Sequence, residues 1–535
     1  MKKDILSINI ILIIILGIFS IGINFYYGNI GVFAVDTFAF FDTAYSILIN
    51  KHPFKDIWIT SGPLVDYLQA IFFKIFGINW FSYVLHASIF NLLITVICFF
   101  ALNKLGLKSY YSFFYSISVA ILCYPVAGTP FAYQHSYILS IISLFLFFIS
   151  MKSESIILWF LLPIIMVFSF LSLHVPASYI NFILLISIFI YFKYNYTLSK
   201  IISFLLGSIF ILLFLISFFL FFEIPIINFV QQYILFPLSV GEYRVTGQEY
   251  SYFSLEERFT FRGVVGHFKF LHLFLILIFI TLITNFFKKK SYKVEKVDLI
   301  IYFSLLSSTV LLIFHQLITS NQIFIFSMIP ILAGFLHILW QKNLEKISFY
   351  HFIILFLVVI ITFKYNNEYN IKRKFMDLQN VDLSKAVSAN LLDSKLNGLK
   401  WISPFFSGTP EEEINLLKDT IKIVGEDSRN KMLITDHQFF SAILDQDLNI
   451  PNRWYTGDGS SYPLKGHRSK NHKYFNFYKN FLINKINNDK IEIIYSIQNP
   501  EKSMTVDYFL PYIDKYCVES KQYNSILWSY IIKEC

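Results

Sequence analysis

The chain has 535 residues, of which 56% are hydrophobic and only 15% charged, with 62 Phe and 34 Tyr. Together with a mean hydropathy of +0.58, this composition excludes an ordinary soluble protein and predicts that most of the chain lies in lipid. The formal net charge is +9, but the lysines cluster between apolar blocks, where they orient membrane helices, and this argues against a nucleic-acid partner.

Apolar blocks of about 16 to 23 residues recur along the chain, which is the length that a helix needs to cross a bilayer. We therefore predict a polytopic α-helical membrane protein with about eleven transmembrane helices. No small-residue cleavage site precedes Tyr26, so the first span is expected to be an uncleaved anchor. The expected spans are 5–24, 81–102, 109–124, 135–150, 155–173, 176–193, 200–222, 268–287, 298–314, 323–340 and 348–363.

Lysines fall in alternate connections between these spans, and the positive-inside rule places those connections in the cytoplasm together with the N-terminus. The segments 25–80 and 223–267 and the tail from 364 are then expected on the outer face of the inner (plasma) membrane. The lysines concerned are Lys104, Lys108, Lys152, Lys193, Lys200, Lys288, Lys289, Lys290, Lys293, Lys296, Lys342 and Lys346.

The first outer segment carries acidic residues close to the membrane. Asp36 follows the first span directly, where a carboxylate is costly unless it is used or paired. Asp42 and Asp56 lie further along the same segment. The pair Gly62-Pro63 is predicted to start an amphipathic helix that lies along the membrane interface.

In this arrangement, with Asp36 just beyond the first span and Gly62-Pro63-Leu64 in a structured outer loop, the chain resembles the GT-C superfamily of membrane glycosyltransferases. These enzymes use polyprenyl-phosphate sugars and include protein mannosyltransferases and lipid A aminoarabinose transferases. The resemblance implies a GT-C-like fold with an outer C-terminal domain, and Asp36 as the catalytic base. The paired acidic motif of the superfamily is absent because Thr37 follows Asp36, so Asp42 and Asp56 stay competing candidates.

The expected activity is an inverting transfer of a sugar from a polyprenyl-phosphate-linked donor to a hydroxyl of a cell-envelope glycan, lipid or protein. Such a transfer needs a base for the acceptor and cations for the departing phosphate. Arg244, Arg258 and Arg262 in the segment 223–267 are the candidates for the donor phosphate. Arg258 and Arg262 are four residues apart and are predicted to share a helical face. For any single arginine, an ion pair at the surface or a contact with a lipid headgroup is a simpler explanation than catalysis.

Polar residues interrupt the apolar segments on the outer side and are expected to line a cavity that contacts the substrate. A histidine at such a turn is more often structural than a ligand, and no compact metal motif such as His-Glu-x-x-His occurs, so we assign no metal and no cofactor. These candidate substrate-binding residues are His174, His315, Gln316, Asn321, Tyr133 and His135.

The division that we predict is a transmembrane domain over 1–363 and a soluble α/β domain over 364–535, which is long enough to bury a core. The segments 431–436 and 491–497 are predicted strands, followed by helical stretches at 437–444 and 508–516. The segment 449–463 is either a packed connection or an acceptor contact. Cys517 and Cys535 are either a disulfide or two free thiols.

Two other functions fit parts of the pattern. A polymerase or ligase of lipid-linked oligosaccharides also has many helices and outer arginines, without needing an acidic residue after the first span. A transporter or flippase predicts charged residues near mid-membrane and often a repeated half, and the spans hold few such residues. A structural membrane protein with an exported binding domain would not need so many polar groups on one side.

Overall fold

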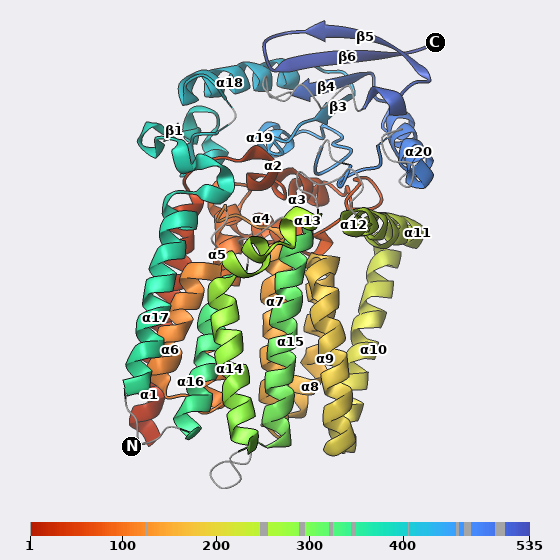
Figure 1. The fold of residues 1–535 in the computed structure, drawn as a ribbon. Coiled ribbons are helices and arrows are strands. Elements are labelled where there is room, and N and C mark those ends of the chain that lie inside the picture. Colours follow the sequence, from red (N-terminus) through yellow and green to blue (C-terminus); the bar gives the residue numbers. More distant parts are fainter. Residues whose placement is uncertain are drawn as a thin grey trace.

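The computed structural model describes residues 2–123, 127–246, 255–287, 295–319, 325–343, 349–404, 406–455, 459–464, 472–497 and 509–535. The protein has three layers (Figure 1). A bundle of long helices carries a middle layer of short helices at one end, and the C-terminal domain covers that layer. We call this end of the bundle the domain end, and the N-terminus lies at the opposite end.

Within the described residues, every span expected from hydropathy contains a long helix, because a long apolar block satisfies its backbone within itself. In the part of the chain that the structure describes, seven helices are long and apolar enough to cross a membrane. α7 is almost entirely buried, whereas α10 turns mostly apolar side chains outward, as a lipid-facing helix does. The chain is a polytopic helical membrane protein. The long helices are α1 Lys2–Gly28, α5 Trp80–Lys104, α6 Ser109–Cys123, α7 Ala132–Met151, α8 Ile156–Ser172, α9 His174–Tyr194, α10 Leu198–Phe221, α14 Lys269–Phe287, α15 Lys296–Thr319, α16 Met328–Asn343 and α17 Phe349–Tyr365.

Where the structure describes them, the lysine-bearing connections lie at the end of the bundle opposite the C-terminal domain (Figure 1). Asp298 joins two of them to the start of α15, since its carboxylate lies 2.8 Å from Lys152 and 3.0 Å from Lys342. Lys200 donates a hydrogen bond to the Ser153 carbonyl at 3.1 Å. The predicted alternation of connections is therefore confirmed for these residues. Lys288, Lys289, Lys290, Lys293 and Lys346 lie outside the described residues.

Short helices form the middle layer. α4 begins at Pro63 as predicted, after Gly62 in the left-handed region at φ +67°. A Cβ at Gly62 would lie 2.7 Å from the Phe40 ring, so only glycine fits there. One face of α4 is buried and includes Phe73, while the other turns apolar side chains such as Ile75 outward. The elements of this layer are α2 Ala34–Thr37, α3 Phe41–Leu48, α4 Pro63–Phe76, α11 Ile226–Phe229, the π-helix Val230–Leu235, α12 Phe236–Thr246, α13 Leu255–Arg258 and the π-helix Arg262–Gly266.

The C-terminal domain is α/β, with a four-stranded sheet in the order β3-β4-β6-β5. β3 and β4 are the two predicted strands and pair in parallel, while β6 pairs antiparallel with both β4 and β5. The larger elements are β1 Val387–Ser388, β2 Lys400–Trp401, α18 Pro410–Glu426, β3 Lys431–Ile434, α19 Phe440–Leu444, α20 His472–Asn488, β4 Ile493–Ile497, β5 Tyr516–Gln522 and β6 Leu527–Glu534. Between α17 and β5 lie the π-helix Asn366–Ile371 and the 3₁₀ turns Lys374–Met376, Leu378–Asn380, Leu383–Lys385, Ala389–Leu391, Ser394–Leu396 and Leu510–Tyr512.

Of the two helices predicted in this domain, one is present in the described residues and the other is not. The stretch 437–444 contains a short helix, α19. The prediction of a helix over 508–516 is wrong, since the described part of that stretch holds only the 3₁₀ turn Leu510–Tyr512. From Tyr516 onward the backbone is extended, because it pairs with β6.

The C-terminal domain and the first loop share one hydrophobic core. The Phe38 ring lies 4.7 Å from Phe439 and 5.8 Å from Trp401, measured between ring centroids. The backbone N–H of Val32 donates to the Ile402 carbonyl at 2.8 Å. The domain is therefore packed onto the loop that follows α1.

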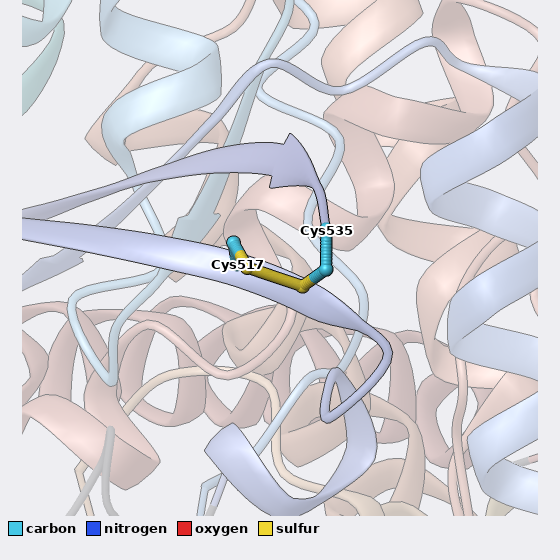
Figure 2. The surroundings of a disulfide bond; sticks show 2 residues. All are labelled: Cys517 and Cys535. Carbon is cyan, nitrogen blue, oxygen red and sulfur yellow. A yellow bond between two sulfur atoms is a disulfide. The ribbon is translucent and has the colours of Figure 1, made fainter.

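Cys517 and Cys535 form a disulfide across the β5–β6 hairpin (Figure 2). Their Cα atoms are 5.0 Å apart, inside the usual range for a disulfide. Cys98 and Cys123 are buried free thiols inside the bundle.

Replacing Cys517 and Cys535 together by Ser is expected to lower the stability of the C-terminal domain by about 3 kcal/mol, because the bridge closes a loop in the unfolded chain. Thermal unfolding of the purified protein with and without reductant measures the effect. The wild type in reductant should match the double variant, while a Cys98→Ala, Cys123→Ala variant should keep the sensitivity to reductant. A wild type that unfolds at the same temperature in both conditions would contradict the prediction.

Candidate active site

Asp36 lies in the short helix α2, where the first loop leaves α1 and meets the C-terminal domain. Its side chain is partly exposed, and among the described residues its carboxylate forms no hydrogen bond or ion pair. Burial, and then repulsion by Asp436, raise the pKa of Asp36 from 3.8 to about 7. A carboxyl group with a pKa near the working pH is suited to take up a proton.

The position of α2 is fixed by contacts on both sides. The Thr37 hydroxyl accepts a hydrogen bond from the backbone N–H of Phe33 at 2.9 Å. From the C-terminal domain, the indole N–H of Trp454 donates to the Val35 carbonyl at 2.8 Å. Asp36 is therefore held in a defined place although its own carboxylate is left for other contacts.

The other two candidate bases make structural contacts. Asp42 is fully buried, and its carboxylate accepts the backbone N–H groups of Ser441 at 3.1 Å and Ala442 at 2.9 Å, which caps the start of α19. Burial raises the pKa of Asp42 to about 7, and these amides oppose the rise. Asp56 accepts the backbone N–H of His52 at 2.7 Å and so closes a local turn.

A second group of polar side chains gathers where α7, α9 and α15 reach the domain end. The Gln316 amide donates to the Tyr133 hydroxyl at 2.7 Å. The rings of Tyr133 and His315 are stacked with centroids 5.4 Å apart. His174, at the start of α9, lies edge-on to Tyr233 at 5.4 Å. Four of the predicted substrate-binding residues thus meet in one region.

Arginines border this region. Arg244, on α12, is within electrostatic range of His174, His315 and Arg258. Arg258 is buried and donates from Nη1 to the carbonyls of Leu317 at 3.1 Å and Ile318 at 2.7 Å, near the end of α15. Burial, and then the Arg244 guanidinium, lower the pKa of Arg258 from its ordinary value. Guanidinium groups held near one another are suited to share an anion.

The prediction that Arg258 and Arg262 share a helical face is wrong. Arg258 ends α13, and Arg262 begins a separate π-helix. Between them Thr260 makes a turn, since its hydroxyl accepts the backbone N–H of Gly263 at 3.1 Å. The Arg262 side chain is exposed, whereas Arg258 is buried and hydrogen-bonded to the end of α15.

A series of electrostatic interactions runs from Asp36 to this polar region through Tyr83, Arg453 and Tyr233. Tyr83 is within electrostatic range of both Asp36 and Arg453. Arg453 is in turn within electrostatic range of Tyr233, whose ring packs on His174. The candidate base and the arginines therefore lie at the same end of the bundle, under the C-terminal domain.

No protein-family profile matches the chain, and no curated protein sequence matches it. Among solved structures, the chain is similar to the crystal structure of the oligosaccharyltransferase of Archaeoglobus fulgidus in complex with zinc and sulfate. The identity is 12% and the TM-score 0.41, over 97% of this chain and 73% of that one. With values this low, a functional conclusion has to come from the residues of the site itself.

The remaining predicted substrate residues lie elsewhere. His135 is buried, and its Nε2 is 3.1 Å from Nε2 of His86, whose other ring nitrogen contacts Gln69 at 2.9 Å. Residues two apart on a helix point about 200° apart around its axis, so His135 and Tyr133 face different neighbours. Asn321 lies outside the described residues. Within the ranges that the structure describes, no three His, Cys, Asp or Glu side chains come together as a metal site would require.

Sequence reasoning missed the partners that the C-terminal domain supplies. Arg453 forms a buried ion pair with Asp66 of α4 and also donates to the Ser61 carbonyl. Asp436 follows β3 and raises the pKa of Asp36. The sequence signal for Asp436 was its position at the end of a buried strand, where the ligand-binding residues of α/β sheets gather. The described part of the segment 449–463 is a packed connection, and Arg453 is its anchor.

Proposed function

We propose that this protein is an inverting membrane glycosyltransferase, which moves a sugar from a polyprenyl-phosphate donor to an acceptor hydroxyl at the domain end of the bundle. The observation that carries the proposal is Asp36, a partly exposed carboxyl group with a pKa near 7 that lies at the same end as Arg244 and Arg258. A base near neutrality and a cationic region for a phosphate are the two requirements of such a transfer.

In the proposed reaction, Asp36 takes the proton of the acceptor hydroxyl as the hydroxyl oxygen attacks the anomeric carbon of the donor sugar. The bond between that carbon and the phosphate oxygen breaks, and the electron pair leaves with polyprenyl phosphate. Arg244 stabilises the charge that develops on the phosphate, while Arg258 positions the end of α15 beside it. Attack from the side opposite the phosphate inverts the anomeric configuration.

We further propose that the domain end faces the outside of the inner (plasma) membrane. The lysine-bearing connections at the opposite end support this orientation through the positive-inside rule. The disulfide between Cys517 and Cys535 supports it as well, because disulfides persist in oxidising compartments. The donor would then enter from the outer leaflet.

The test is a transfer assay in detergent or nanodiscs with a panel of polyprenyl-phosphate sugars, followed by mass spectrometry of the released polyprenyl phosphate. Arg244→Gln is expected to raise the KM for the donor and lower kcat/KM by roughly 10- to 100-fold, since a charge-assisted contact contributes about 1.5 to 3 kcal/mol. Arg262→Gln is the matched control, because Arg262 is an exposed arginine from the same segment. It should behave like the wild type.

Two results would count against this function. If the wild type binds no polyprenyl-phosphate lipid, the donor assignment fails and transport of another solute becomes the better hypothesis. If Arg244→Gln and Arg262→Gln reduce kcat/KM equally, general surface charge explains the effect, and Arg244 has no specific contact with the phosphate.

A further inference from the structure

A cavity of about 300 Å³ opens in the C-terminal domain, away from the arginines described above. Its lining residues come from the segments 381–385, 402–404 and 406–413. This volume is at the lower end of the range for small-molecule sites, roughly 300 to 1,000 Å³. The cavity is thus large enough for one small ring system.

Glu413 of α18 lines the cavity and is buried. Its carboxylate accepts a hydrogen bond from the Trp401 indole at 2.8 Å and from the Ser403 hydroxyl at 3.0 Å. These contacts fix the orientation of the carboxylate. Since a carboxylate can accept about four hydrogen bonds, Glu413 can still accept one from a ligand.

The mouth of the cavity combines charged and apolar groups. Asp382 and Lys385 are exposed there, and Asp382 accepts the Ser384 hydroxyl at 2.6 Å with only one of its two oxygens. Phe406 and Pro410 supply the apolar surface. Fixed acceptors, one ammonium donor and an aromatic ring are the groups that suit a sugar, whose hydroxyls both donate and accept hydrogen bonds. Two carboxylates disfavour an anion, and the polar walls disfavour an acyl chain.

The cavity adjoins the loop of Asp36. Ile402 lines the cavity, and its carbonyl accepts the backbone N–H of Val32, four residues before Asp36. Trp401 contacts both sides, because its indole N–H donates to Glu413 while its ring packs on Phe38 at 5.8 Å. The backbone segment that lines the cavity is therefore also the segment that pairs with the loop of Asp36.

We propose that this cavity binds a sugar unit of the acceptor, through the carboxylates of Glu413 and Asp382 and the apolar surface of Phe406. The proposal rests on the glycosyltransferase function and adds to it that the acceptor is a carbohydrate. The cavity holds the acceptor one or more sugar units away from the hydroxyl that reacts.

The test is saturation-transfer NMR on the full-length protein in detergent, with a panel of methyl glycosides of common hexoses and N-acetylhexosamines as probes. The wild type and the Asp36→Asn variant should both bind at least one glycoside. Glu413→Gln should lose at least tenfold in affinity, and Asp382→Ala should weaken binding as well. Asp382 is exposed, so this second variant keeps the test valid if Glu413→Gln fails to fold. Glu411→Gln, an exposed glutamate on the same helix, is the matched control and should bind like the wild type.

Donor turnover separates this inference from the proposed function. Hydrolysis of a polyprenyl-phosphate sugar in the absence of acceptor should be unchanged in Glu413→Gln, while the KM for a carbohydrate acceptor rises. A wild type that turns over the donor but binds no glycoside overturns the cavity assignment and leaves the function intact. Glycoside binding that both cavity variants retain overturns it too. Glycoside binding without any donor turnover supports the cavity as a sugar site and contradicts the transferase.

Discussion

Replacing Asp36 by Asn is expected to lower kcat by roughly 10²- to 10⁴-fold, the usual contribution of a general base, while the Kd for the lipid-linked donor stays unchanged. Asparagine keeps the shape of the side chain and cannot take the proton of an acceptor hydroxyl. Calorimetry for donor binding and mass spectrometry of the transfer product measure the two quantities separately. Retention of more than about a tenth of the wild-type rate by a variant that still binds donor would place the base elsewhere.

Two variants of the same loop serve as controls for Asp36→Asn. Asp56→Asn removes a carboxylate that closes a local turn and should leave kcat close to the wild-type value. Asp42→Asn replaces one of the two oxygens that accept the Ser441 and Ala442 N–H groups by an NH2 group, which cannot accept them, and should lower the unfolding temperature, while the folded fraction keeps its turnover. If Asp42→Asn instead abolishes turnover without loss of stability, the base is Asp42.

The pH dependence of the rate gives an independent check on the same side chain. The pKa of Asp36 is raised to about 7, so the carboxyl group is mostly protonated below that pH and cannot act as a base. The rate should therefore rise with pH and level off above about 7. Because repulsion by Asp436 contributes to the raised pKa, Asp436→Asn should move this rise to lower pH. A purely structural role of Asp36 would not produce that shift.

The helices of the bundle could be predicted because the length of an apolar block is a local property of the sequence. β3 and β4 could be predicted for a similar reason, since both are short continuous apolar runs that are buried on both faces. β5 could not, because most of its side chains are polar and exposed, and its conformation comes from pairing with β6. The start of α18 could have been predicted from its capping box, Thr409 and Glu412, but the hydropathy pattern alone does not reveal it.

The candidate site likewise has residues that the local sequence predicts and residues that it does not. Asp36, His174 and His315 were found because each is a polar residue beside an apolar span. The groups that surround them come from elsewhere in the sequence, and only the tertiary fold brings them close. Arg453 and Asp66 are 387 residues apart, so no local pattern could pair them. The role predicted for the arginines of the segment 223–267 stays a prediction, and the turn at Thr260, which places Arg258 and Arg262 in separate helices, could not be read from their spacing.

The ion pair of Asp66 and Arg453 should be the most costly polar contact to break between the loop and the C-terminal domain. Both side chains are buried, with 0% and 1% exposure. The Thr43 hydroxyl donates to Asp66 at 2.5 Å, and the Arg453 guanidinium lies 4.3 Å from the centre of the Phe40 ring. The guanidinium also opposes the rise in the pKa of Asp66 that burial causes. Each charge therefore depends on its partner for compensation.

Asp66→Asn is expected to cost roughly 3 to 5 kcal/mol, because it leaves the Arg453 charge buried without its counterion. For a domain of this size, that corresponds to a fall in unfolding temperature on the order of 10 °C. Scanning calorimetry or thermal fluorescence of the purified protein measures the change. The matched control is Glu519→Gln in the exposed pair with Lys533, at 2.8 Å, which should cost no more than about 1 kcal/mol.

The double variant Asp66→Leu, Arg453→Met separates the energy of the pair from the cost of an isolated charge. Replacing both members of a buried pair by apolar residues is often neutral for stability, so the double variant should unfold at a higher temperature than Asp66→Asn. It should nevertheless transfer sugar more slowly than the wild type, since Arg453 lies within electrostatic range of Tyr83 and Tyr233, the residues that join Asp36 to His174. If the double variant regains both stability and full activity, Arg453 only holds the domain in place. If it regains stability alone, Arg453 also positions the residues of the candidate site.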